Sequence, residues 1–351
     1  MSRPRIGLDL GVLAAPHPPG VQRVAKELSD RLVARSHFEW VPLLPKPSEF
    51  AESSRRRSLW WRQWQLPKRA REARLDGLQT FTSAFPLGLT GPVVPVLHEL
   101  PWRHGVQENA GHRHRAWVRL ASAKAAAAIV PSRHVWRDLA VVAPNLADRT
   151  RVIPWGVHER YLATDAELDL PREPVLWVLG GTRPKKRADA AIVALAHFPS
   201  AADAPTSEFR LVITGDAHPH REALRELAEK LGVSDRVEFR EHVNEDDLPA
   251  QLKRATAVFS LGDSEGFGLP VLEALAAGTP AIVPLKSAQS EAAGDRALHA
   301  LADDPRTLIG ALKRALAQGP AERRANRDFA ERSDWDRVAR EVEHLWSDLL
   351  A

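Results

Sequence analysis

Two glutamates flank a glycine-rich turn in the stretch DSEGFGLPVLEALAAGTP, residues 263–280. Gly266 and Gly268 allow the backbone to turn tightly and to approach a ligand closely. A helix that starts directly after this turn leaves its first amides without intrahelical partners, and such amides bind phosphate well. Glu265 and Glu273 would repel a phosphate, but their oxygens accept hydrogen bonds from hydroxyl groups. A nucleotide sugar satisfies both conditions, because its diphosphate lies between a ribose and a hexose.

Each glutamate alone also has a simpler interpretation. Glu265 can be an ordinary loop residue. Glu273 can be a charge in the first turn of the helix predicted over 270–277, where a carboxylate complements the helix dipole. The complete string, with a carboxylate on each side of the glycine turn, favours the binding-site interpretation.

A second segment concentrates positive charge. In LGGTRPKKR, residues 179–187, Gly180 and Gly181 permit a turn at the end of a strand. Four basic residues follow closely: Arg183, Lys185, Lys186 and Arg187. A nucleoside diphosphate gains negative charge as it leaves, and arginine and lysine side chains stabilise that charge. Because basic residues are unfavourable at the start of a helix, the cluster favours a functional role over a solvated helix end.

The spacing of the histidines in the sequence does not predict a metal site. The nearest candidates are His98 with Glu99 and His112 with His114, and neither pair has the spacing of a known metal site. His98 directly follows the strand predicted over 93–97, and a histidine at the carboxyl end of a strand is a candidate for ligand contact. We therefore expect no metal and no cofactor, with a nucleotide-diphosphate sugar as co-substrate.

Strands and helices must position these residues, and in the second half of the chain they alternate. The pattern predicts strands over 175–179, 209–213, 237–239, 257–261 and 281–283, and helices over 188–197, 222–231, 247–254 and 270–277. Such alternation predicts an α/β fold with a parallel, doubly wound sheet covered on both faces. Both chemical segments then follow strands, at the sheet edge where ligands bind in these folds.

The first half has the same pattern less clearly. Strands are predicted over 5–10, 93–97, 128–130 and 151–153, and helices over 21–34 and 113–127. A length of 351 residues fits two domains. We place an N-terminal Rossmann-like domain at 1–160 and a C-terminal one at 161–332. The tail, 333–351, carries an apolar stripe at helical spacing, so it is predicted to pack on a core as one helix.

The composition excludes several classes of protein. No cysteine is present, which excludes disulfides, thiolate catalysis and iron–sulfur clusters. The apolar part of the N-terminus is too short for a membrane span and contains Asp9, so a cytoplasmic location is expected, without a signal peptide. The net charge of +4 suits anionic ligands, anionic membranes or nucleic acid and does not choose among them.

Tryptophan and arginine gather in residues 53–75. Trp60 and Trp64 share one face of a helix, with Trp61 beside them, and Pro67 is expected to interrupt that helix. Three interpretations stay open. The tryptophans pack on the first domain, contact a membrane surface, or bind single-stranded nucleic acid, and the last is the least favoured.

The string from Ser264 to Pro280 resembles the signature of glycosyltransferase family 4, in which two glutamates stand eight positions apart. The resemblance implies a retaining, nucleotide-sugar-dependent enzyme of the GT-B fold. In that fold two Rossmann-like domains face each other across a cleft, and a C-terminal helix crosses back to the first domain. By this resemblance Glu265 contacts the donor sugar hydroxyls and Glu273 holds the ribose. The backbone amides that face sugar and phosphate are those of Gly266, Phe267, Gly268 and Leu269.

The same resemblance implies a basic pair at the end of the strand over 175–179. Lys186 fits the lysine position, and Arg183 is the candidate for its partner. The loop is one residue shorter than in common versions, so Lys185 can share or take that role. Gly181 is expected to approach the donor through its backbone.

In the first domain the resemblance is weaker. His98 is similar to a histidine that faces the donor sugar, and Gly20 to a glycine loop that approaches the diphosphate and the acceptor. Arg23 is a further candidate for contact with an acceptor or a phosphate. The segment between the domains departs from the family, because Trp155 stands where an asparagine is common.

We therefore expect a metal-independent glycosyltransferase that moves a hexosyl group with retention from a nucleotide sugar to a saccharide or lipid-linked acceptor. Surface polysaccharide or glycolipid synthesis is the expected context, with membrane contact through 53–75 at the inner face. Two alternatives stay open. One is an epimerase-like enzyme that acts on the nucleotide sugar without an acceptor, and the other is an inactive nucleotide-binding scaffold.

Overall fold

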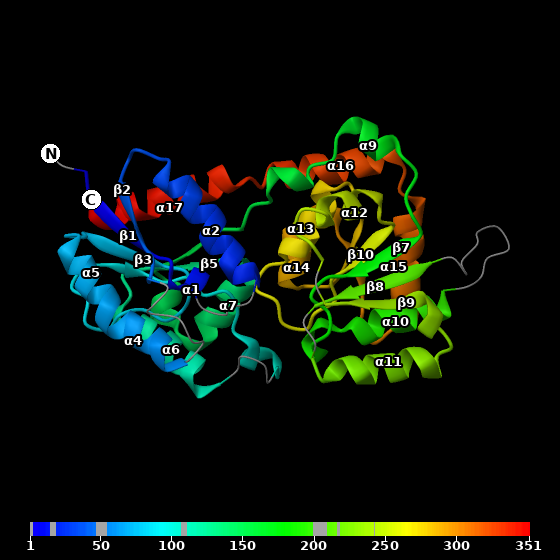
Figure 1. Cartoon of the computed structure of the whole chain (residues 1–351), viewed down its shortest axis with the longest axis horizontal. Helices are drawn as coiled ribbons and strands as arrows, with labels where there is room; N and C mark the ends of the chain where they lie inside the picture. The colour runs from blue at the N-terminus through cyan, green and yellow to red at the C-terminus, as the bar shows by residue number, and fades with distance from the viewer. Residues whose placement is uncertain are drawn as a thin grey trace. The chain divides into compact units, whose positions relative to one another are not determined.

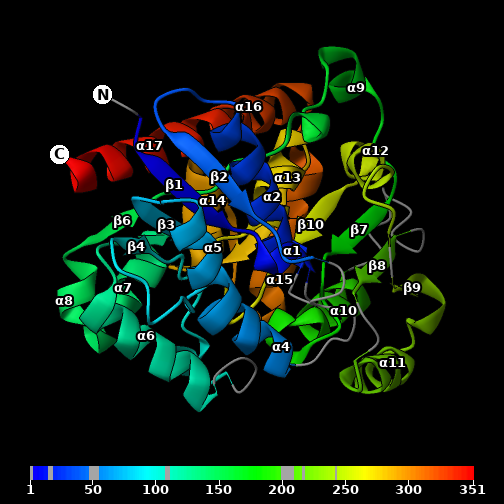
Figure 2. The same ribbon diagram turned by 60° about the vertical axis from the view of Figure 1, so that its left-hand side comes forward.

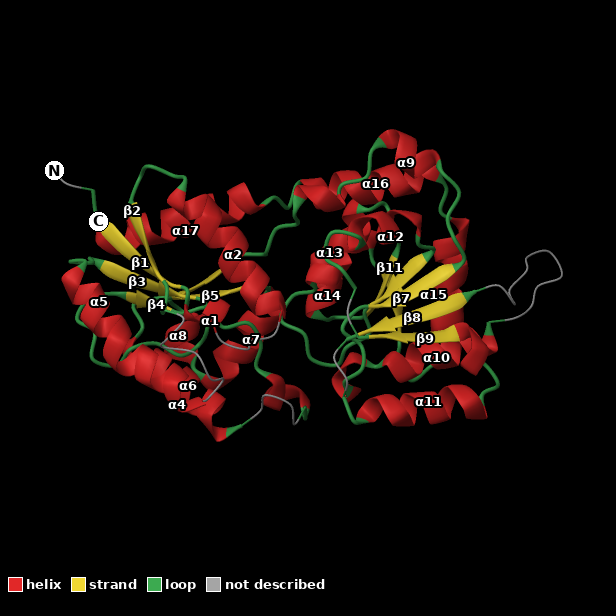
Figure 3. Cartoon of the chain, in the orientation of Figure 1, coloured by secondary structure: helices red, strands yellow, loops and turns green. Residues whose placement is uncertain are grey.

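The computed structural model describes residues 3–14, 19–46, 55–106, 111–198, 209–215, 218–241 and 243–351. The chain divides into two compact units, one built from residues 1–156 together with 335–351 and the other from residues 157–334. In each unit, helices cover the two faces of a parallel sheet (Figures 1 and 3). The predicted α/β fold class is confirmed.

The N-terminal unit contains a parallel sheet in the order β2-β1-β3-β4 and a parallel pair, β5-β6. A bridge between Val96 and Ile129 joins the two sets. The strands are β1 (Arg5–Asp9), β2 (Glu39–Leu43), β3 (Gly77–Thr80), β4 (Val93–Val94), β5 (Ala128–Val130) and β6 (Thr150–Val152). The helices are α1 (Gly11–Ala14), α2 (Pro19–Val33), α4 (Arg55–Trp60), α5 (Leu66–Glu72), α6 (His112–Lys124), α7 (Arg133–Val142), α8 (Pro144–Ala147) and the final α17 (Trp335–Leu350), with a π-helix at Trp61–Gln65 and a 3-10 helix at Pro101–His104.

The last helix, α17, packs on the sheet of the N-terminal unit (Figures 1 and 2). Trp346 is fully buried, and its Nε1 donates a 3.2 Å hydrogen bond to Oε1 of Gln79 on β3. Gly77 leaves the space for this indole, because a Cβ there would lie 2.3 Å from a Trp346 ring carbon. Arg35 forms an ion pair with the buried carboxylate of Glu343. The apolar stripe of the tail is thus buried in the core of the N-terminal unit.

The C-terminal unit has one six-stranded parallel sheet in the order β12-β11-β10-β7-β8-β9. Its strands are β7 (Val175–Val178), β8 (Arg210–Thr214), β9 (Val237–Arg240), β10 (Ala257–Phe259), β11 (Ala281–Pro284) and β12 (Leu298–Ala300). Its helices are α9 (Asp165–Asp169), α10 (Ala188–His197), α11 (His220–Lys230), α12 (Leu248–Arg254), α13 (Leu269–Ala276), α14 (Ala288–Ala293), α15 (Pro305–Ala317) and α16 (Pro320–Glu331). Helices α10, α11 and α15 lie on one face, and α12, α13, α14 and α16 on the other (Figure 3).

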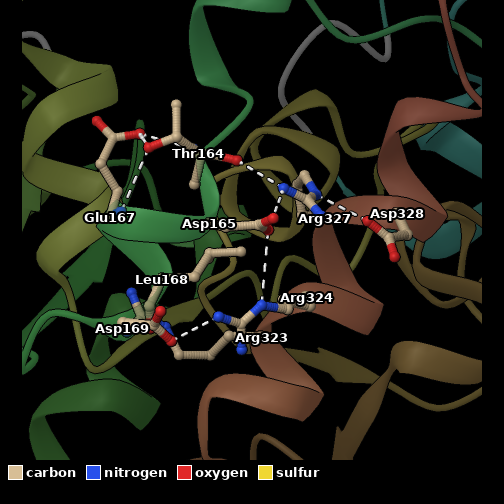
Figure 4. Close-up of polar contacts among 10 residues, drawn as sticks. Thr164, Asp165, Glu167, Leu168, Asp169, Arg323, Arg324, Arg327 and Asp328 are labelled. Atoms are coloured by element: carbon tan, nitrogen blue, oxygen red, sulfur yellow. Dashed lines mark hydrogen bonds and ion pairs between the residues drawn. The ribbon is translucent and has the colours of Figure 1, made fainter.

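Arginines of α16 hold the start of this unit in place. Figure 4 shows Arg324 and Arg327 reaching the carboxylates of Asp169 (2.6 Å) and Asp165 (3.0 Å) on α9. Arg323 is buried and donates to the carbonyl oxygens of Leu168 and Leu170. These carbonyls lie where a helix end leaves acceptors without intrahelical donors, so the arginine stabilises the end of α9.

The tryptophan segment differs from its prediction. Pro67 does not end the helix, because the π-helix at Trp61–Gln65 passes directly into α5, in which Pro67 is the second residue. Trp61 is buried, whereas Trp64 is 68% exposed and Trp60 is 41% exposed. Core packing therefore holds for one tryptophan of three. Residues 53 and 54 lie outside the described part of the chain, and so do the side chains of 55–57.

No helix among the described residues is long and apolar enough to cross a bilayer. The helix predicted over 21–34 begins earlier, at Pro19. Gly20 therefore lies inside the first turn of α2 and not in a loop before it, because proline favours the first position of a helix.

We predict that Gly77→Ala destabilises the N-terminal unit by about 1–3 kcal/mol, because the added methyl group overlaps the ring of Trp346. Thermal unfolding followed by circular dichroism measures the effect. Gly88→Ala is the matched control, since a Cβ at Gly88 has no atom within 4 Å. Equal melting temperatures for the two variants would contradict the packing of α17 on β3.

Candidate active site

The strand order of the C-terminal unit creates a switch point between β7 and β10. From β7 the chain builds outward through β8 and β9, and it then returns to β10 on the other side of β7. In open α/β sheets, ligands bind outside the carboxyl ends of the strands at such a point. The basic segment follows β7 and the glycine-rich segment follows β10, so the fold brings them together.

An ion pair joins the two segments. Nζ of Lys186 lies 2.7 Å from Oε1 of Glu265, and both side chains are largely buried. Burial opposes ionisation of the Glu265 carboxyl, but the charges of Lys186, Lys185 and Arg183 outweigh that effect and hold the pKa of Glu265 below its ordinary value. Glu265 is therefore an ionised carboxylate at neutral pH, inside a group of cations. The structure thus brings these four predicted site residues together.

Backbone contacts fix the two loops against each other. The amide of Asp263 donates to the carbonyl of Lys185 at 3.0 Å. From α14, the side-chain amide of Gln289 donates to the carbonyl of Gly262 at 3.0 Å. A Cβ at Gly262 would lie 2.9 Å from Oε1 of Glu265, so only glycine lets the carboxylate lie this close to the backbone.

Arg187 has a structural role that the sequence does not reveal. Its guanidinium contacts three carboxylates: Asp189 at 3.2 Å, Asp263 at 3.4 Å and Asp303 at 2.5 Å. Its backbone has a φ of 54°, which is unfavourable for a residue with a side chain. The three contacts hold Arg187 in this conformation. Of the four basic residues, Arg187 serves the fold of the loop, and its charge is balanced by acids of the same unit.

The turn after β7 needs both of its glycines. Gly180 has a φ of 66°. A Cβ at Gly181 would lie 2.3 Å from Cγ1 of Val178, and the Gly181 amide donates to the carbonyl of Thr214 at 2.7 Å. The packing of the turn alone therefore explains these residues, and contact between Gly181 and a donor stays a prediction.

Helix α13 begins at the glycine-rich turn. Its first residue is Leu269, and Gly268 occupies the cap position with a φ of 123° and makes no side-chain cap. The start of the helix thus has the character of an anion site. Phe267 is buried, so ligand contact at this position would come from its backbone.

The prediction that Glu273 lies in the first turn of a helix is wrong. Because α13 starts at Leu269, Glu273 is in its second turn, beyond the region where the helix dipole acts strongly. Its side chain is only 4% exposed. A carboxylate is rarely buried to this degree without a specific role, so the simple dipole interpretation does not account for Glu273.

Two further candidates belong to the N-terminal unit. Nε2 of His98 lies 2.9 Å from the carbonyl oxygen of Phe81. A carbonyl oxygen can only accept, so this nitrogen carries the proton. The ring of Trp155 is 6.0 Å from that of His98 and stacks on Trp335 at 6.1 Å. The unusual Trp155 thus connects His98 with the start of α17. Gly20 is exposed in the first turn of α2.

We predict that Lys186→Met destabilises the fold by about 1–3 kcal/mol near neutral pH, because it leaves Glu265 buried without its closest cation. The pKa of Glu265 is lowered in the folded state. The pair therefore stabilises the protein fully at pH values above the ordinary glutamate pKa, and this stabilisation is lost as the pH falls through the pKa of the folded state. The melting temperatures of variant and wild type should therefore converge in acid.

Lys313→Met is the control, since Lys313 is exposed on α15. A difference between Lys186→Met and wild type that stayed constant from neutral to acid pH would show that the pair does not control the ionisation of Glu265.

Known proteins resemble this chain in sequence. The family model described as glycosyl transferases group 1 matches residues 164–333. The D-inositol 3-phosphate glycosyltransferase of Acidothermus cellulolyticus is 33% identical over 219 residues, which are 58% of this chain and 49% of that protein. Its counterpart from Salinispora tropica is 31% identical over 229 residues, 61% of this chain and 45% of that protein. The chain thus spans about half the length of these relatives.

Solved structures match almost the whole chain. The sucrose-phosphate synthase of Thermosynechococcus elongatus has a TM-score of 0.73 at 19% identity and covers 99% of both chains. HepE of Anabaena, solved with UDP-glucose, has a TM-score of 0.73 at 16% identity, over 99% of this chain and 100% of that one. At such identities the likeness establishes the fold, which is that of GT-B glycosyltransferases. Residues 164–333 are thus similar in sequence to the glycosyl transferases group 1, and the chain as a whole has the fold of GT-B glycosyltransferases.

Proposed function

We propose that this chain transfers a hexosyl group from a nucleotide-diphosphate sugar to a hydroxyl group of a saccharide or lipid-linked acceptor, with retention. The observation that carries the proposal is the Lys186–Glu265 pair at the switch point of the C-terminal sheet, directly before α13, whose N-terminal cap position is Gly268. Together these groups offer cations and amides to a diphosphate and carboxylates to hydroxyl groups.

Each residue of the proposed donor site has a role that its environment supports. Lys186 and Arg183 stabilise the charge on the leaving diphosphate, with Lys185 contributing from a buried position. Glu265, kept ionised by these cations, accepts hydrogen bonds from the sugar. Glu273 accepts hydrogen bonds from the ribose hydroxyl groups. The charge on the diphosphate is balanced by side chains, so the proposal requires no divalent metal.

The proposed reaction is a front-face substitution. The bond between the anomeric carbon and the diphosphate oxygen breaks, and the acceptor oxygen forms a bond to the same face of that carbon. The acceptor proton passes to the leaving diphosphate. Glu265 orients the sugar and is not a covalent nucleophile, because a carboxylate held by Lys186 is a weaker nucleophile than a free one. His98 is proposed to contact the donor sugar from the N-terminal unit, which would bind the acceptor.

The nucleotide is proposed to be a uridine diphosphate. The support is that HepE of Anabaena was solved with UDP and with UDP-glucose, and that its fold matches this chain. For the acceptor, the names of relatives point to small phosphorylated polyols or sugars. A further solved structure of the same fold, with a TM-score of 0.70 at 18% identity, is WaaG, a glycosyltransferase involved in lipopolysaccharide biosynthesis. Surface polysaccharide or glycolipid assembly therefore stays part of the proposal.

We predict that UDP raises the melting temperature of the wild type more than GDP or ADP does, in buffer without divalent metal. Glu273→Gln keeps the side-chain volume but removes the negative charge of the group that accepts hydrogen bonds from the ribose. UDP should therefore bind about tenfold more weakly. Glu229→Gln is the control, because Glu229 is exposed on α11.

If no nucleotide shifts the wild type, the donor-site assignment is wrong. Conversion of a UDP-sugar without any acceptor would favour an epimerase-like enzyme. Binding without turnover on any donor and acceptor pair would favour an inactive scaffold.

We also propose that the segment predicted for membrane contact, 53–75, touches an anionic membrane surface through its helical part, 58–72. Leu59, Trp60 and Trp64 are 52%, 41% and 68% exposed, and the exposed Lys68 and Arg71 follow on α5. Exposed tryptophan beside basic residues is typical of helices that lie at the headgroup level of a bilayer.

We predict that the double variant Trp60→Ser, Trp64→Ser reduces sedimentation with phosphatidylglycerol-containing vesicles at least about fivefold, from the loss of two interfacial side chains. Leu170→Ser is the control, since Leu170 has a similar exposure of 52% but lies in the C-terminal unit. Equal sedimentation of all three proteins would refute membrane contact through this segment.

A further inference from the structure

Three metal-ligating side chains converge in the N-terminal unit, outside every residue used above. His134 and Asp138 stand four positions apart on α7, so they lie on the same face of the helix. His104 is the last residue of the 3-10 helix Pro101–His104, which Gly105 ends with a φ of 71°. The sequence gives no hint of this group, because 30 positions separate His104 from His134.

The geometry is compact. Nε2 of His104 lies 2.6 Å from Oδ2 of Asp138. The rings of His104 and His134 are stacked, with centroids 5.0 Å apart and planes inclined by 19°. One ligand atom from each of the three residues lies within 4.8 Å of the other two. Asp138 is buried and the two histidines are partly buried.

These separations are close to those of a bound ion. Nitrogen and oxygen ligands about 2.0–2.2 Å from a tetrahedral Zn²⁺ lie roughly 3.4 Å from one another. The His104–Asp138 contact would open by about 0.8 Å as the ion replaces the proton between them, and no other pair would have to close by more than about 1.4 Å. Side-chain rotation supplies movements of this size without a change in the backbone.

A simpler interpretation is a hydrogen-bonded His104–Asp138 pair that stabilises the fold. Arg103 adds to the charge balance there, since its Nε lies 3.6 Å from Oδ1 of Asp138. That contact is longer than a hydrogen bond, and the Arg103 side chain is exposed enough to turn away. The pair alone gives no reason for a second imidazole stacked on the first. A shared cation accounts for both imidazoles and the carboxylate.

We propose that His104, His134 and Asp138 bind a divalent transition-metal ion, with Zn²⁺ as the best match, and that water completes the coordination. Two imidazoles and one carboxylate are a donor set that zinc accepts. Nε2 of His104 must present its lone pair to the ion, so its proton moves to Nδ1 or leaves to solvent.

Such an ion would act on structure and not on the transfer reaction. It would tie residues 101–104 to α7, and these residues closely follow His98, which lies in the loop after β4 (Val93–Val94) and not directly at a strand end. The donor-site residues Lys186 and Glu265 belong to the other unit. The proposal is therefore independent of the proposed function, and either can fail without the other.

Isothermal titration with Zn²⁺ tests the site, on the 351-residue chain that has been treated with chelator and carries no histidine tag. We expect one Zn²⁺ per chain with micromolar affinity or better. His134→Ala and Asp138→Asn should each weaken binding at least tenfold. His112→Ala should leave it unchanged, because His112 is exposed on α6 and outside the group.

Substitution with Co²⁺ gives a second readout. The wild type should show the visible absorption of a four-coordinate site, and Asp138→Asn should lose it. Circular dichroism without metal establishes that each variant is folded. Absence of Zn²⁺ binding to the wild type, or equal binding by wild type, His134→Ala and Asp138→Asn, would overturn the proposal.

Discussion

The ion pair between Lys186 and Glu265 is the interaction on which the candidate site depends. It spans the switch point of the C-terminal sheet and links the loop after β7 to the loop after β10. A carboxylate buried at this position would be costly without a cation, and a lysine buried there would be costly without an anion. Each loop is therefore stabilised by the other. Together they hold the charged side chains of Lys186 and Glu265 at the carboxyl edge of the sheet.

Much of the surrounding structure serves that pair. The three carboxylates around Arg187 hold an unfavourable backbone conformation directly after Lys186. Gln289 holds the carbonyl of Gly262, and the missing side chain of Gly262 makes room for Glu265. Farther away, the buried Arg323 and the partly buried Arg172 donate hydrogen bonds to backbone carbonyls of the same unit.

The sequence predicts the C-terminal unit better than the N-terminal one, for physical reasons. Strands such as β7 and β11 are buried in a central sheet and appear as apolar runs, and α10 has the predicted bounds, Ala188–His197. In the N-terminal unit, β2 contains Pro42 and β3 begins with Gly77, residues that oppose a strand assignment. Proline is tolerated in β2 because β2 is an edge strand, and glycine is required in β3 because Trp346 packs there.

The candidate site divides in the same way. Lys186, Arg183, Lys185 and Glu265 could be found because they stand close to strand ends and glycine turns. Glu273 lies in the second turn and not in the predicted first turn, because the helix begins one residue earlier, at Leu269. The roles of Arg187 and Gln289, and the grouping of His104 with His134 and Asp138, depend on residues distant in the chain. A pattern of neighbouring residues in the sequence does not predict contacts of this kind.

The most direct test of the account compares UDP with uridine in equilibrium titrations of wild type and Lys186→Met. If the Lys186–Glu265 pair marks the diphosphate site, UDP should bind the wild type at least about tenfold more tightly than uridine, and the variant should lose most of that preference. An unchanged ratio of the two affinities in the variant would contradict the account, because the diphosphate would then lie elsewhere.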